Sequence, residues 1–157
     1  FTGQRDPRYR AVDAQISQLL SEAKAASGIA HQVVRSGSIV PWFNDASGLV
    51  TDISSVVSDF LASEKPYAVF DHENLGAKEF REAYPSSAAA TILSRDGEGI
   101  ADFIDVVTDR TPDQLAQYRS KLSVYLLGPT EKRTVSAFAA SVEALIERSE
   151  RERSAYR

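Results

Sequence analysis

Acidic side chains around a pair of glycines, in residues 94–105, are the part of this sequence most like a ligand site. With Gly99 as position 6 of an EF-hand-type loop, the positions that would ligate calcium carry oxygen-bearing residues. These residues are Ser94, Asp96, Glu98, Asp102 and Asp105. However, Ser replaces the usual first Asp, and a short Asp replaces the last bidentate Glu. An acidic glycine turn that begins the next helix explains the same residues, so we expect no tight calcium binding and no metal site.

The two histidines, His31 and His72, give a weaker signal for metal. His72 stands between Asp71 and Glu73, whereas ligands on one helix face are usually three or four residues apart. Glu73 is better placed to support the beginning of a helix. The sequence also has no nucleophile elbow, phosphate loop or dinucleotide fingerprint. We therefore predict that the protein is not an enzyme and needs no cofactor.

Composition narrows the class of protein further. The 157 residues include no Cys and no Met, which excludes disulfides, thiolate metal sites and Cys nucleophiles. These are also the side chains most easily oxidised, and the chain begins with Phe1, so we expect a mature exported protein. A net charge of −4 argues against nucleic-acid binding, and no apolar run is long enough to span a bilayer.

Two short segments are candidates for contact with a partner protein. Arginine and tyrosine crowd into residues 1–10, and such a basic arm would bind an acidic protein surface. A solvated terminus, with its tyrosine covering the first helix, is the simpler alternative. Trp42, beside Phe43, is either a core residue or a binding hot spot. The predicted partner-binding residues are Arg5, Arg8, Tyr9, Arg10 and Trp42.

The apolar residues recur mostly at helical spacing. Pro7 and Gly28 bound a first helix, and a second runs from about Ser47 to Glu64, where Pro66 prevents continuation. Shorter helices are expected around residues 71–84, 88–93 and 100–107, and longer ones over residues 111–127 and from Thr130 onward. Alternating charges keep the segment 147–157 helical in water.

These elements predict an all-α protein, an up-and-down helical bundle of four long helices plus two or three short ones. Residues 1–157 form one helical domain, with residues 1–10 as the basic arm and 147–157 as the charged helix end. The bundle would bury the apolar stripes of its helices. The expected core residues are Ile16, Leu19, Ile53, Val57, Phe60, Leu122, Phe138, Val142 and Leu145.

One resemblance follows from these residues. Trp42, followed by Leu49, Ile53, Val57 and Asp59 along the next segment, resembles the PsbQ-like extrinsic subunits of photosystem II. The resemblance covers about a fifth of the chain, and the Lys-rich character of that family is missing. It implies a four-helix protein of the thylakoid lumen that docks on the oxygen-evolving side of photosystem II.

The sequence therefore predicts a non-catalytic exported subunit that docks on a larger, membrane-associated protein assembly without inserting into the membrane. Two alternatives remain open. A self-assembling helical coat or structural protein would need no other partner, and a secreted carrier would hold an apolar ligand in a cavity.

Overall fold

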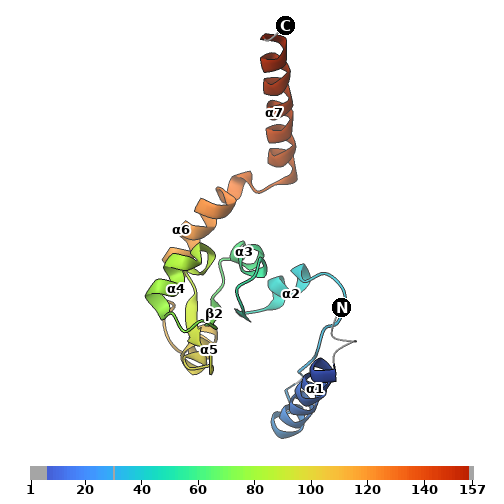
Figure 1. Cartoon of the computed structure of the whole chain (residues 1–157), viewed down its shortest axis with the longest axis vertical. Coiled ribbons are helices and arrows are strands. Elements are labelled where there is room, and N and C mark those ends of the chain that lie inside the picture. Colours follow the sequence, from blue (N-terminus) through green and yellow to red (C-terminus); the bar gives the residue numbers. More distant parts are fainter. Residues whose placement is uncertain (1–6, 30, 156–157) are drawn as a thin grey trace. The chain divides into compact units, whose positions relative to one another are not determined.

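The computed structural model describes residues 7–29 and 31–155, and it divides into two compact units, residues 1–39 and 40–157. In the first unit, helix α1 spans Pro7–Ser27 (Figure 1). The sequence predicts both of its ends. Pro7 is the first helical residue, and Gly28 follows the last turn with a positive φ of 71°. Within this unit, Arg35 forms an ion pair with Asp13 at 2.8 Å.

A three-stranded parallel sheet organises the second unit. Its strands are β1 (Leu49–Thr51), β2 (Tyr67–Asp71) and β3 (Thr91–Ser94), and they lie in the order β1-β2-β3. In the register, Leu49 is opposite Tyr67, and Asp71 is opposite Ser94. Each connection between parallel neighbours crosses over through helices, which is the usual βαβ arrangement.

Short helices connect and follow the strands. Before β1 comes α2 (Val40–Asp45), and α3 (Val56–Leu61) joins β1 to β2. Helix α4 (Ala77–Ala83) and the 3-10 turn η2 (Pro85–Ser87) join β2 to β3. After β3 follow α5 (Ile100–Val107), α6 (Ala116–Leu127), the turn η3 (Thr130–Lys132) and α7 (Val135–Ala155).

The core lies around the central strand. Strand β2 is buried at four of its five residues, which explains its continuous apolar run of Tyr, Ala, Val and Phe. Phe60 of α3 packs edge-on against Phe43 of α2, with ring centroids 5.2 Å apart. The larger cluster of buried residues comprises Phe43, Val57, Phe60, Leu61, Tyr67, Val69, Phe80 and Ala90.

The chain is tightly packed at Gly48, immediately before β1. A Cβ atom at this position would lie 2.7 Å from Cγ2 of Val107 and 3.2 Å from Cζ of Phe103. Both side chains belong to α5, so the helix approaches the backbone just before β1 more closely than any side chain there would allow. Only glycine fits this position without a shift of the helix.

The all-α bundle is therefore wrong, because the chain contains a parallel sheet. The helix expected over residues 47–64 is in fact strand β1, a loop and the short helix α3. The expected helix over residues 88–93 overlaps strand β3 instead. Strand β2 was missed altogether. Its residues form a short apolar run, and such runs carry neither the period of a helix nor the alternation of a half-buried strand.

Other boundaries agree with the sequence or shift by a few residues. Helix α5 spans the predicted residues 100–107, and Gly128 ends α6 as expected. Helix α6 begins at Ala116 rather than near Pro112. The last helix begins at Val135, because Thr130 starts a separate 3-10 turn.

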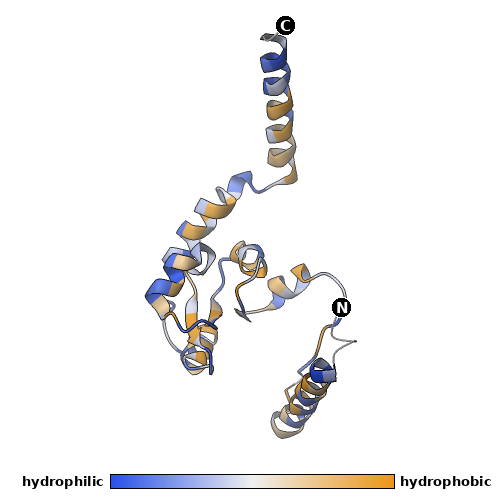
Figure 2. Ribbon diagram, in the orientation of Figure 1, coloured by the Kyte–Doolittle hydropathy of each residue, from blue (hydrophilic) through white to orange (hydrophobic). Residues whose placement is uncertain are grey.

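The predicted core is correct only beside the sheet. Val57 and Phe60 are fully buried, and Leu122 packs against the core as a partly buried residue. The remaining predicted core residues are exposed. They are Ile16, Leu19, Ile53, Phe138, Val142 and Leu145. Most of them belong to α1 and α7, where hydrophobic residues recur along the ribbon (Figure 2).

Candidate functional site

The carboxyl ends of the three parallel strands lie at one edge of the sheet, and polar loops follow each of them. β1 is followed by Asp52, Ser54 and Ser55, and β3 is followed by Arg95 and further polar residues. The central strand ends with Asp71 itself. In open α/β sheets, this edge is where ligands usually bind, because the loops there are held by rigid strands. We call these three loops and Asp71 the carboxyl-edge site.

Asp71 is the most constrained side chain of the carboxyl-edge site. It is buried, and its Oδ2 atom accepts a hydrogen bond from the backbone N–H of Gly76 at 2.8 Å. Burial alone would raise its pKa, but the backbone N–H groups of residues 73–76 hold the pKa below the ordinary value. Asp71 is therefore an anion that shapes the loop after β2. Its other oxygen, Oδ1, has no hydrogen-bond partner among the described residues.

The loop after β1 offers hydroxyl groups. The Oγ atom of Ser54 is shielded from solvent and has no hydrogen-bond partner among the described residues. Ser55 is exposed, precedes α3, and makes no side-chain capping bond to it. The Ser55 hydroxyl is therefore accessible at the carboxyl edge, and the Ser54 hydroxyl makes no hydrogen bond within the described residues.

The loop after β3 is the acidic glycine turn that the sequence indicated. Ser94 Oγ accepts a hydrogen bond from the backbone N–H of Glu98 at 2.9 Å, and Gly97 and Gly99 both have positive φ. Asp105 forms an ion pair with Arg110 at 3.1 Å. Asp96, Glu98, Asp102 and Asp105 do not gather into a cluster, since no group of three metal-ligating side chains occurs among the described residues. Their weak calcium affinity stays a prediction.

His72 and Glu73 have other contacts within the described part of the chain. The ring of His72 stacks on Phe70 with centroids 5.9 Å apart. A carboxylate oxygen of Glu73 accepts a hydrogen bond from the hydroxyl of Tyr84 at 3.1 Å, and this bond is the main reason that the pKa of Tyr84 is raised.

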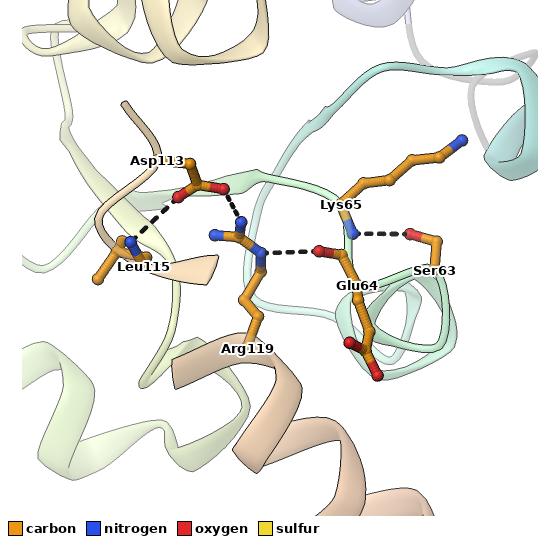
Figure 3. Close-up of polar contacts among 6 residues, drawn as sticks. All are labelled: Ser63, Glu64, Lys65, Asp113, Leu115 and Arg119. Carbon is orange, nitrogen blue, oxygen red and sulfur yellow. Dashed lines mark hydrogen bonds and ion pairs between the residues drawn. The ribbon is translucent and has the colours of Figure 1, made fainter. Parts of the chain in front are cut away.

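A second polar cluster lies around the loop between α3 and β2, just before the central strand begins (Figure 3). Arg119 of α6 is almost completely buried and forms an ion pair with Asp113. Its Nε atom donates a hydrogen bond to the carbonyl oxygen of Glu64 at 3.1 Å. The second carboxylate oxygen of Asp113 accepts from the backbone N–H of Leu115 at 3.0 Å. Arg119 therefore ties the beginning of α6 to the loop between α3 and β2.

Burial also controls the ionisation of this cluster. Desolvation lowers the pKa of Arg119, and it raises the pKa of Tyr67 to about 12 despite the nearby guanidinium. The Tyr67 hydroxyl donates a hydrogen bond to the carbonyl oxygen of Ser86 at 2.7 Å. Each buried polar group has a partner within the fold, so we assign this cluster to stability.

The predicted partner-binding residues fall in two different units of the chain. Arg5 lies outside the described residues, whereas Arg8, Tyr9 and Arg10 belong to the first turns of α1 rather than to an extended arm. Trp42 is in α2, and 42% of its surface is exposed, so it is not the core residue that Phe43 is. Both Tyr9 and Trp42 remain accessible to a partner.

No motif in the sequence marks the carboxyl-edge site. The signal that would reveal it is the position of Asp71 at the end of a buried β-strand, and this signal can be used only once the strand has been recognised. Elsewhere, an open apolar groove of about 240 Å³ runs along α6, lined by Ala88, Ala89, Tyr118, Lys121, Leu122 and Tyr125. It is not the enclosed cavity that an apolar-ligand carrier would need.

No helix among the described residues is both long enough and apolar enough to cross a membrane. Comparison of the chain with protein-family models, with curated proteins and with solved structures gave no match.

Proposed function

We propose that the sheet unit binds a phosphorylated, hydroxyl-rich ligand of the nucleotide class at the carboxyl-edge site. The observation that carries this proposal is the buried Oδ1 atom of Asp71, which has no partner among the described residues although it ends the central strand. A buried carboxylate oxygen without a donor is costly, and a ligand hydroxyl would supply the missing hydrogen bond.

The chemistry of the neighbouring loops supports this class of ligand. Ser54 and Ser55 bring hydroxyls that can donate to phosphate oxygens, and Arg95 is the cation closest in sequence to the end of β3. Acidic residues in the same loops suit ribose hydroxyls, as carboxylates do in dinucleotide-binding sheets. A ligand with both groups therefore suits the site better than a simple phosphate, which the acidic side chains would repel. The proposal concerns binding, and the absence of catalysis stays a prediction.

Calorimetric titration with a panel of nucleoside diphosphates, with inorganic pyrophosphate as a simple-anion probe, tests the proposal. We expect at least one nucleotide to bind, pyrophosphate to bind more weakly, and both Asp71→Asn and Ser54→Ala to weaken nucleotide binding about tenfold or more. Ser58→Ala, one turn along α3, is the matched control and should leave binding unchanged. The proposal is wrong if no nucleotide binds, or if the control weakens binding as much as the edge variants.

A second function, docking on a larger protein assembly, is favoured by α1. None of the residues of this helix is buried, although it carries an apolar stripe of Tyr9, Val12, Ile16 and Leu19. Hydrophobic residues that line one face of an exposed helix are typical of a protein-binding surface. This stripe, rather than the arginines near the terminus, is the feature that supports docking.

We do not extend the docking proposal to photosystem II or to the thylakoid lumen, because the resemblance implied a four-helix bundle that the chain does not form. A native pull-down with the whole chain tests docking itself. Ile16→Glu and Leu19→Glu should each abolish recovery of a partner, whereas Gln18→Glu, off the stripe, should not. Equal recovery with all three variants would remove α1 from the proposal.

A further inference from the structure

Helix α7 carries an apolar seam that the described residues leave uncovered. Val135, Phe138, Val142 and Leu145 follow one another at intervals of three, four and three residues, which is the a/d spacing of a coiled coil. The exposed fractions are 86% for Val135 and 70% for Phe138, so this seam is in water rather than in a core. Ile146 flanks it and is also exposed.

We propose that this seam pairs α7 with α7 of a second copy of the chain, in antiparallel orientation about a two-fold axis. The spacing is symmetric about the turn that contains Ala139 and Ser141, so reversing one helix still places apolar residues opposite each other. Val135 of one copy then faces Leu145 of the other, and Phe138 faces Val142. Such a contact uses the same surface on both copies and therefore closes as a dimer.

The residues around the axis favour a close approach of two copies. Ala139 and Ser141 flank the seam there and are both small, and Ser141 donates its hydroxyl hydrogen bond to Ala137 O of its own helix at 2.8 Å. No charged side chain therefore lies at the centre, where two copies would present like charges to each other.

The charges beyond the seam fit a second copy better than a strongly charged partner. Residues 143–153 carry four glutamates and three arginines, a nearly balanced set. Some of these already interact within the helix, as Arg148 does with Glu152 at 2.9 Å. In the antiparallel pair most of these residues extend beyond the first residue of the partner's α7, so they do not bring like charges together. An acidic or basic partner would gain no attraction from a segment that is nearly balanced.

The available area is also sufficient for a pair. The five exposed apolar side chains offer roughly 500 Å² on each copy, so about 1,000 Å² would be buried in total, near the lower limit for a specific interface. We therefore expect a dimer that dissociates on dilution rather than an obligate one.

Because these 157 residues include no Cys, a single introduced cysteine tests the geometry without interference. In an antiparallel pair, the two Ser141 residues flank the axis, so the full-length Ser141→Cys variant should form a disulfide-linked dimer on mild oxidation. Glu143→Cys, on the outer side of the helix, is the control and should cross-link far more slowly. Equal rates for the two variants would contradict the antiparallel pairing.

Sedimentation velocity over a wide range of protein concentration tests the dimer itself. We expect the unmodified chain to shift from monomer to dimer with concentration, and Phe138→Glu to remain monomeric. Ala140→Glu adds the same charge on the outer face and should still dimerise. A chain that stays monomeric at every concentration, or a control that dissociates as Phe138→Glu does, would overturn the proposal.

Discussion

The residues around strand β2 and those of helices α1 and α7 contain similar apolar side chains in opposite environments. Beside the sheet, Phe60 is fully buried and packs against Phe43. Along α7, Phe138 has 70% of its surface exposed. An apolar stripe in the sequence predicts a surface that is stable only when something covers it. Within the described fold, the surfaces that are covered are those that lie beside the parallel sheet.

The comparison is sharpest for two phenylalanines. Phe60→Ala should lower the free energy of unfolding by about 4 kcal/mol, because it removes a fully buried ring and leaves a cavity. Phe138→Ala should change it by less than about 0.5 kcal/mol when measured by urea denaturation at low protein concentration. If both changes were equally costly, α7 would have to be part of the core.

Two arginine ion pairs make the same comparison with charges. Arg119→Ala should cost about 3 kcal/mol, because it leaves Asp113 and the Glu64 carbonyl without their buried partner. Arg148→Ala breaks an exposed pair with Glu152 and should cost no more than about 0.5 kcal/mol. Chemical denaturation of both variants measures the difference. A small effect of Arg119→Ala would show that the buried ion pair with Asp113 does not stabilise the fold.

Gly48 tests how tightly α5 packs against the sheet unit. Gly48→Ala should destabilise the protein by about 2 kcal/mol, because the new methyl group would meet Val107 at 2.7 Å. The change should cost less in a Val107→Ala background, where the nearest clash is removed. Thermal unfolding of the single and double variants measures this coupling, and strict additivity would argue against the close approach.

The smallest effect concerns alkaline pH. The pKa of Tyr67 is raised to about 12 in the folded state by burial, while an unfolded tyrosine titrates near 10. The folded state therefore holds this proton more tightly, so stability falls as the pH rises from about 10 to 12, by roughly 2 kcal/mol at most. Tyr67→Phe should reduce this pH dependence in urea titrations, whereas Tyr125→Phe, at an exposed tyrosine, should not.

Helices bounded by strong local signals were predictable from the sequence. Pro7 and Gly28 bound α1, and the acidic glycine turn before α5 also appeared as expected. These signals act through backbone geometry within a few residues, so they need no tertiary contact to be recognised. The seam of α7 was likewise visible as a periodic pattern.

The sheet and its carboxyl-edge site depended on tertiary structure. Strands β1 and β3 have three and four residues, and their hydrogen bonds join segments that are far apart in the sequence. Local periodicity therefore favoured a helix for the residues of β1 and β3, and gave no signal for β2. Asp71 illustrates the consequence. The sequence shows that this residue is an aspartate, but not what surrounds it. Its burial, its bond to Gly76 and its unpartnered oxygen arise only when the parallel strands bring their ends to one edge.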